Sequence, residues 1–223
     1  TWVGYPSDDN VETILSLHLN SGSFSMQEIE EIEGKALYIF ANKKQMKEHN
    51  LERLKAQHSY ENPVARLKAI STSKGKLLRN IPKCFKQDNQ IEPVSNICRG
   101  AKVQLAGRNF EPDWGLYNGS IGTVKEIVFK KGESPLDGTL PQYVIVEFLE
   151  YCGPAWIKNQ PKWVPIPPVE IQCQSHCCSV KFVPLSLAYA KTGHTFQGQS
   201  AGPGHSIPCI IIQPGSSKME KLC

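Results

Sequence analysis

The sequence predicts an α/β protein that carries a second, β-rich unit, and three segments support this. The apolar run 36–40 is followed by a polar turn and an amphipathic stretch that ends near Gln57. Short β-type segments separated by turns fill residues 120–183. A further apolar segment begins at Pro184 and changes abruptly into a polar, glycine-flanked loop. Strand, turn and helix in that order make half of a βαβ unit, whereas closely spaced short strands are typical of a small barrel.

The N-terminal residues predict two short helices. Asp8 and Asp9 can cap a helix that starts near Asn10 or Val11, and Gly22 is a suitable end for it. Ser25 and Glu28 have the spacing of a capping box for a second helix, which Gly34 would end.

The run 36–40 is apolar throughout, as expected of a parallel strand that is buried on both faces. Asn42 follows as a helix N-cap, with Gln45 three residues later. The helix is expected to run to about Gln57, with one side formed by Met46, Asn50, Leu51 and Leu54. Residues 63–70 are a candidate for a further strand, and residues 207–212 predict a final buried strand.

Composition places the chain among ordinary globular proteins and excludes few functions. Of its 223 residues, 40% are hydrophobic and 21% charged, and the net charge of +4 permits nucleic-acid binding without arguing for it. No apolar run is long enough for a membrane span, and the first residues carry neither an initiator Met nor a secretory signal. We therefore expect a piece of a longer intracellular protein, nuclear or mitochondrial in a eukaryote and otherwise cytoplasmic, without a membrane partner.

The eight cysteines are not spaced like a disulfide framework, so reduced thiols are expected. One cluster, Cys173, His176, Cys177 and Cys178, has soft metal ligands close together. Adjacent residues on a strand point to opposite faces, and no second Cys-x-x-Cys pair completes a site. We assign no metal ligands from the sequence, which leaves open whether this cluster binds a metal.

The loop that follows the apolar segment 184–190 is rich in groups that can both donate and accept hydrogen bonds, including His194 and Gln197. Gly193 and Gly198 allow backbone to approach a ligand closely. Their spacing matches that of a phosphate-binding P-loop, but Gln199 occupies the position of the essential lysine. Nucleotide anchoring by this loop is therefore disfavoured.

A second ordered pattern lies earlier in the chain. Residues 100–105 read as a strand, Asn109 follows, and the segment 115–124 contains the tight-turn pair Asn118-Gly119 and a further glycine at Gly122. Between the first helices and this pattern, a basic stretch is either a solvated surface or part of a nucleic-acid path; it comprises Lys74, Lys76, Arg79, Lys83 and Lys86.

Both patterns resemble superfamily-1 DNA helicases of the RecD and Pif-one type. The segment 100–124 is similar to that family's "G-A-x-V-M-L-x-x-N…G-L-x-N-G-x-x-G-x-V". The loop is similar to its "A-x-A-x-T-x-H-x-x-Q-G-x-T", with matches at Ala188, Ala190, Thr192, His194, Gln197, Gly198 and Ser200. The copy departs from the family at Thr195-Phe196, where Lys-Ser is usual, and at Gly193, where an aliphatic residue is usual.

The resemblance implies the second RecA-like motor domain: a parallel sheet with helices, a P-loop NTPase fold without the P-loop, interrupted by a small SH3-like β-barrel. Residues 1–119 and 184–223 would form the motor domain, and 120–183 the barrel. The parent would be an ATP- and Mg²⁺-dependent 5′-to-3′ helicase that acts in DNA repair or recombination, with a missing N-terminal RecA-like domain as partner. The expected single-stranded DNA contacts are Asn42, Asn109, Asn118, Thr192, His194, Thr195 and Gln197, and the loop geometry would depend on Gly119, Gly122, Gly193 and Gly198.

Two alternatives remain open at this stage. Asn42 is equally well explained as a plain helix cap. The chain could also be a non-catalytic nucleic-acid-binding or scaffold remnant of a helicase, because Thr195-Phe196 replaces Lys-Ser and the segment His18-Leu19-Asn20 lacks the arginine that the family usually carries there. No catalytic residue is expected in the chain itself, and no cofactor is expected to bind it alone.

Overall fold

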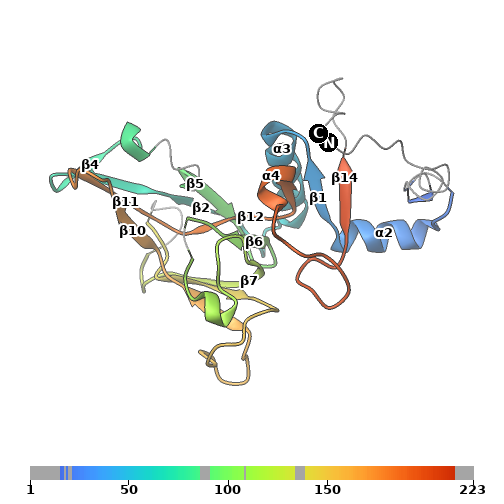
Figure 1. Cartoon of the computed structure of the whole chain (residues 1–223). Coiled ribbons are helices and arrows are strands. Elements are labelled where there is room, and N and C mark those ends of the chain that lie inside the picture. The colour runs from blue at the N-terminus through green and yellow to red at the C-terminus, as the bar shows by residue number, and fades with distance from the viewer. Residues whose placement is uncertain are drawn as a thin grey trace. The chain divides into compact units, whose positions relative to one another are not determined.

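The structure is a computed structural model, and it describes residues 16–17, 19, 22–85, 91–107, 109–133 and 139–213. The chain divides into two compact units, residues 1–36 and 37–223. Most of the first predicted helix lies outside the described residues. The elements are named as in Figure 1.

The described part of the first unit contains one helix, α2 (Met26–Lys35). Its capping box is confirmed: the Ser25 hydroxyl accepts a hydrogen bond from the backbone N–H of Glu28 at 3.3 Å, and the Glu28 carboxylate accepts one from the Ser25 N–H at 2.8 Å. Two N–H groups that the helix itself leaves unpaired are thereby satisfied.

In the second unit, a small parallel sheet positions the polar loop. β1 (Leu37–Phe40) lies between β13 (Ala190–Thr192) and β14 (Ile210–Gln213) and pairs parallel with both. Helix α3 (Lys43–Gln57) packs against β1 and β13, and the short helix α4 (Gly193–Phe196) follows β13 directly (Figure 1). The expectation that the last strand is buried was wrong: Ile212 on β14 is 67% exposed, because β14 is an outer strand of this sheet in the described residues.

A buried asparagine joins α3 to the loop-bearing strand. The Asn50 side chain accepts hydrogen bonds from the backbone N–H groups of Tyr189 and Ala190, at 2.9 and 2.8 Å, and donates one to the Ala190 carbonyl at 3.1 Å. Nearby, the Tyr189 hydroxyl donates to Gln57 at 2.7 Å. Asn50 is therefore a hydrogen-bonding anchor, whereas Leu51, expected on the same side, is 43% exposed.

The other described strands pair antiparallel, so the mixed α/β class is confirmed, and the parallel sheet has three strands in the part of the chain that the structure describes. Strand order is β12-β6-β7-β8-β9 in a five-stranded sheet, β10-β11-β3-β4 in a four-stranded sheet, and β2-β5 in a pair. The bounds are β2 (Ala65–Lys68), β3 (Ile70–Ser73), β4 (Lys76–Leu78), β5 (Val94–Ile97), β6 (Lys102–Leu105), β7 (Ile121–Val128), β8 (Tyr143–Glu147), β9 (Trp163–Ile166), β10 (Val169–Gln172), β11 (Cys178–Phe182) and β12 (Leu185–Leu187), with single-turn 3₁₀ helices η1 (Lys83–Phe85) and η2 (Pro112–Trp114).

Strands from residues 120–183 are shared between two sheets. β7, β8 and β9 join β6 and β12, which lie outside the predicted insert, and β10 and β11 join β3. The insert boundaries remain a prediction, and the sheets take strands from both sides of them.

Two hydrophobic clusters hold the second unit together. The larger one joins the five-stranded sheet, the β2-β5 pair and Leu54 of α3. The smaller one lies on the four-stranded sheet and consists of Phe85, Val169, Cys173, Cys178, Val180 and Phe182. Among the described residues, no helix combines the length and apolar character needed to cross a membrane.

Replacing Asn50 tests the anchor. Asn50→Ala leaves two buried N–H groups and a carbonyl without their partner, so the free energy of unfolding should fall by roughly 2–4 kcal/mol, measured by urea denaturation. Glu52→Ala, on the exposed side of the same helix, should change it by less than about 0.5 kcal/mol. Equal effects of the two substitutions would show that Asn50 does not anchor β13.

Candidate nucleic-acid interface

The predicted loop begins at the carboxyl edge of the parallel sheet. Phe40 at the end of β1 lies opposite Thr192 at the end of β13, so Asn42 and α4 leave the sheet at the same edge. Parallel strands bring their loops together at this edge, where open α/β sheets bind ligands. Asn42 is the N-cap of α3: its side-chain oxygen accepts from the Gln45 N–H at 2.9 Å. Its capping role is confirmed, and a contact with DNA remains a prediction.

Thr192 and Thr195 form a local capping box, which limits what they can do for a ligand. The Thr195 hydroxyl accepts from the Thr192 N–H at 3.0 Å and donates to the Thr192 carbonyl at 2.9 Å. Thr192 is 4% exposed. Both side chains therefore fix the start of α4. A direct contact between them and single-stranded DNA stays a prediction.

The side chains of His194 and Gln197 are exposed, one on α4 and the other just after it. Gly193, the first residue of α4, is exposed, and a β-carbon there would meet no atom within 4 Å. Gly198 has a φ of +80°, a conformation that favours glycine and turns the chain away from the helix. The structure therefore presents His194 and Gln197 outward from a short, capped turn.

The other predicted segment is a tight turn after η2. The side-chain oxygen of Asn109 accepts a hydrogen bond from the backbone N–H of Asn118 at 2.9 Å, and both residues are exposed. Gly119 has a φ of +96° and donates its N–H to the Leu105 carbonyl at 2.8 Å. The Asn109 carboxamide thus holds the turn, while the side chain of Asn118 is left at the surface.

A buried lysine joins this turn to the loop. Lys191 is 1% exposed, and its Nζ donates to Gln199 Oε1 at 2.8 Å and to the Gly119 carbonyl at 3.3 Å. Gln199 Nε2 donates to the same carbonyl at 3.1 Å. Three residues from segments about 70 positions apart thus close a small hydrogen-bonded ring, which we call the Lys191 bridge.

The Lys191 bridge contains no carboxylate. Both acceptors are neutral oxygens, and burial lowers the pKa of Lys191 from 10.5 to about 7 because the charged form loses its hydration. The pairing of a buried lysine with amide oxygens was not predicted from the sequence, where Lys191 is one residue in an apolar run.

Two glycines are required by close packing. A β-carbon at Gly119 would lie 2.8 Å from Gln199 Nε2 and would disturb the bridge. One at Gly122, on β7, would lie 2.6 Å from the Glu147 carbonyl oxygen on β8. Of the four predicted loop glycines, these two are constrained by neighbours from other segments.

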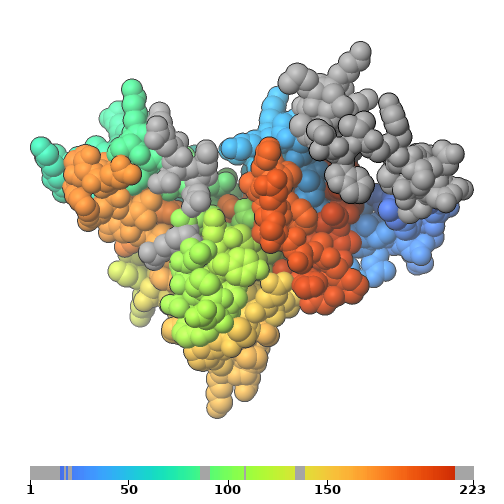
Figure 2. Space-filling view, in the orientation of Figure 1, coloured from blue at the N-terminus to red at the C-terminus, as the bar shows by residue number. Residues whose placement is uncertain are grey.

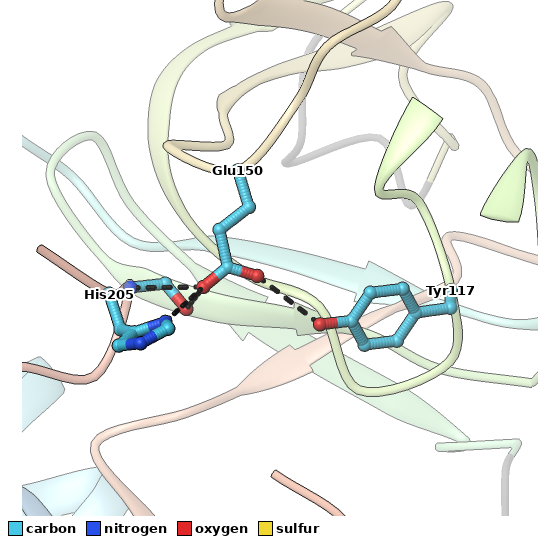
Figure 3. A network of polar contacts seen from close by, with 4 residues as sticks. Tyr117, Glu150 and His205 are labelled. Carbon is cyan, nitrogen blue, oxygen red and sulfur yellow. Dashed lines mark hydrogen bonds and ion pairs between the residues drawn. The ribbon is translucent and has the colours of Figure 1, made fainter. Parts of the chain in front are cut away.

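A hollow of about 190 Å³ lies beside the bridge, lined by Tyr117, Gly119, Glu150, Gln199, His205 and Ser206 among others. Figure 2 shows the green surface of the turn region next to the orange-red surface of the loop region. Figure 3 shows Glu150 at its centre: the Tyr117 hydroxyl donates to one carboxylate oxygen at 3.2 Å, and His205 Nδ1 lies 3.9 Å from the other.

The polar contacts keep Glu150 ionised. Burial acts to raise its pKa, but hydrogen bonds from the Ser206 N–H and hydroxyl, at 3.1 and 2.9 Å, and from Tyr117 outweigh burial and lower it. Burial and the adjacent Glu150 raise the pKa of Tyr117, which therefore stays a neutral phenol. The ionised Glu150 therefore places a negative charge in the lining of the hollow, which disfavours a phosphate there.

A scan of protein-family models and a search of curated proteins gave no match to the chain. Solved structures of Pif1 helicases are similar to it. The Pif1 helicase from Candida albicans is 21% identical, with a TM-score of 0.57 over 88% of this chain and 43% of that one. The Bacteroides Pif1 helicase in complex with ADP-AlF3 and ssDNA is 15% identical, with a TM-score of 0.54 over 93% of this chain and 45% of that one. The chain therefore has a Pif1-like fold and spans less than half the length of these helicases.

The Lys191 bridge makes a prediction about pH. The folded state holds Lys191 with a pKa of about 7, below the 10.5 of an exposed lysine. Between these values the unfolded chain binds more protons, so this group destabilises the fold below pH 7 and the penalty is relieved as pH rises toward 10. The free energy of unfolding of the natural chain should gain up to about 1.4 kcal/mol per pH unit relative to Lys191→Met. Parallel pH profiles of the two proteins would contradict the lowered pKa.

Proposed function

We propose that the chain is the strand-gripping half of a superfamily-1 DNA helicase: its second RecA-like motor domain, of the RecD and Pif-one type, interrupted by an SH3-like unit. In this proposal the whole protein moves 5′-to-3′ on single-stranded DNA and uses ATP with Mg²⁺, and a further RecA-like domain supplies the P-loop. The similarity to Pif1 helicases, one of them determined with ADP-AlF3 and ssDNA, supports the class of function. The three-stranded parallel sheet with α3 supports a motor-domain body.

The observation that carries the proposal is the Lys191 bridge. It locks the Asn118-Gly119 turn to the loop that presents His194 and Gln197, although the two segments are about 70 residues apart. Both are segments that resemble the helicase family in sequence. Two polar loops that are held rigidly together at the edge of a sheet suit a binding site that must fix the position of its ligand.

The hydrogen bonds to DNA proposed here are to its backbone, and none of the proposed contacts is specific for one base. His194 and Gln197 are exposed and can hydrogen-bond phosphate or sugar oxygens. Tyr117, which is 39% exposed at the neighbouring turn, offers an aromatic face on which a base can stack. Because Glu150 makes the hollow acidic, we place the phosphates over α4 and leave the hollow to uncharged parts of the strand.

ATP chemistry must come from elsewhere in the parent. The position where a P-loop has its lysine is Gln199, and its side chain is directed at Lys191 and Gly119. Phosphoryl transfer needs positioned cationic groups and Mg²⁺ at the γ-phosphate. The chain supplies neither in this loop.

A non-catalytic role in nucleic-acid binding is the second candidate, and the capping box favours it. Thr195-Phe196 replaces the usual Lys-Ser, so one cation is missing from the grip, and the Thr195 hydroxyl is engaged with Thr192. Under this alternative the chain binds single strands weakly and couples to no motor.

Binding of single-stranded DNA tests both candidates. Fluorescence anisotropy with labelled oligonucleotides of several sequences should show weak binding that falls steeply between about 50 and 200 mM salt. The double change His194→Ala, Gln197→Ala should weaken binding roughly 10- to 30-fold at every sequence, because each lost hydrogen bond contributes roughly 1 kcal/mol.

His58→Ala is a matched control. His58 is exposed and follows the 15-residue helix α3 at the end away from the sheet edge, about 22 Å from Asn42 along the helix. It should leave affinity unchanged. A folded double variant with the natural affinity would remove His194 and Gln197 from the DNA path.

The isolated chain should hydrolyse no ATP, with or without DNA. Gln199→Lys, which completes the P-loop pattern, should also gain no activity, because the new cation would face Lys191 and not a phosphate. A phosphate-release assay on the purified chain measures both. DNA-stimulated ATP hydrolysis by the natural chain would contradict the proposal that it is only one of two RecA-like domains. The chain would then have to be a complete motor of another kind.

A further inference from the structure

Four cysteines, one of them distant in sequence from the other three, meet at the end of the four-stranded sheet. The sulfur atoms of Cys84, Cys173 and Cys178 all lie within 4.8 Å of one another, and those of Cys84 and Cys178 are 3.3 Å apart. The Cys177 sulfur lies 3.5 Å from that of Cys173 and 3.8 Å from that of Cys178. The sequence pattern showed three of these residues, and the fold adds Cys84 from η1, 94 positions away from Cys178.

The turn between β10 and β11 explains how neighbouring residues can share one site. The backbone N–H of Cys173 donates to the Cys178 carbonyl at 3.0 Å, and that of His176 to the Cys173 carbonyl at 2.8 Å. His176 has a φ of +52°, so the chain does not alternate like a strand before Cys178. Both Cys177 and Cys178 therefore direct sulfur toward Cys173. The objection that adjacent strand residues point apart does not hold at this turn.

The distances fit a tetrahedral thiolate site. Zinc binds thiolate at about 2.3 Å, which places the sulfurs of a tetrahedral site about 3.8 Å apart. The sulfur separations of 3.3, 3.5 and 3.8 Å are close to that value. Cys177 lies outside the group of three sulfurs that are all within 4.8 Å of one another, so zinc binding must draw its sulfur closer to that of Cys84. Thiols that merely fill a core have no reason to converge in this way, because a thiol is a weak hydrogen-bond donor.

We propose that Cys84, Cys173, Cys177 and Cys178 bind one structural zinc ion that fastens η1 to the β10–β11 turn. Cys173 and Cys178 are 6% and 7% exposed and form the floor, while Cys84 and Cys177 are exposed and close the site from outside. All four ligands come from the protein, so the ion has no open position and serves the fold. This role is independent of the proposed DNA grip.

The neighbouring hydrophobic cluster is small and would be stabilised by a bound metal, and basic residues nearby can balance the charge of the zinc site. The smaller hydrophobic cluster has six buried members, two of which are Cys173 and Cys178 themselves. Small cores of this kind are commonly completed by a structural metal. A zinc ion with four thiolates has a charge of about −2, and the segment that brings Cys84 is basic at Lys74, Lys76, Arg79 and Lys83.

His176 does not belong to the group of ligand atoms that lie within 4.8 Å of one another, which is formed by Cys84, Cys173 and Cys178. Its Nδ1 lies 2.9 Å from Gln172 Oε1, which fixes the ring beside β10. This gives a control variant within the same turn. Cys152, which is exposed and lies 3.4 Å by its sulfur from the Asp113 carbonyl, gives a control cysteine outside the cluster.

Metal content of the purified full chain tests the proposal. Without chelators, elemental analysis should find one zinc per chain in the natural protein, in His176→Ala and in Cys152→Ser. Cys84→Ser and Cys178→Ser should lose more than about tenfold of the metal after dialysis, because each removes a ligand from a four-ligand site. Titration of the apo chain with Co²⁺ should give thiolate charge-transfer bands and the intense visible bands of tetrahedral cobalt.

Thermal stability distinguishes a zinc ion that stabilises the fold from one that binds without stabilising it. A strong chelator should lower the Tm of the natural chain and leave that of Cys84→Ser unchanged, since that variant has no ion to lose. The Co²⁺ spectrum of the natural chain decides the question even if a cysteine variant fails to fold. A natural chain without zinc and without thiolate–cobalt bands, equal zinc in Cys84→Ser, or a Cys84–Cys178 disulfide found by mass spectrometry would each overturn the proposal.

Discussion

The buried amino group of Lys191 is the contact on which the candidate interface depends. Its Nζ donates to the Gly119 carbonyl and to Gln199 Oε1, and Gln199 Nε2 donates to the same carbonyl, so the three residues together join the Asn118-Gly119 turn to the loop after α4. The group lies at the carboxyl edge of the parallel sheet, one residue before the Thr192 cap. Its position is set in turn by β13, which Asn50 of α3 holds through three hydrogen bonds. Helix α3 thus positions β13, β13 positions Lys191, and Lys191 connects the two loops.

Burial of an amine among neutral oxygens has an electrostatic cost that a carboxylate partner would reduce. The Lys191 bridge has no such partner, and Glu150, which lines the adjoining hollow, is engaged by Ser206 and Tyr117. An ion pair at the bridge would leave less positive potential at the edge where a phosphate backbone is proposed to lie. The arrangement thus separates negative charge in the hollow from the surface around α4.

Local features were predictable from the sequence, and long-range ones were not. The caps at Ser25 and Asn42 depend on residues three positions apart, so a short window contains both partners. The helix α3 and the strand β1 followed from hydrophobic pattern. The Lys191 bridge and the addition of Cys84 to the other cysteines require partners 72 and 94 residues away, which no local pattern reveals. The burial of the last strand was overestimated because apolar sequence, Ile210 to Ile212, does not show that a strand lies at the edge of a sheet.

The number of donors on Lys191 has a consequence for how the two loops are held. A protonated lysine has three N–H bonds and the neutral amine has two. The bridge offers two acceptors, Gln199 Oε1 and the Gly119 carbonyl, so the uncharged amine can satisfy both. With a pKa of about 7, both protonation states are populated near neutrality, and each can make the same pair of hydrogen bonds. The hydrogen bonds between the two loops therefore form whether or not Lys191 is protonated. In a salt bridge, by contrast, loss of that proton would abolish the ion pair.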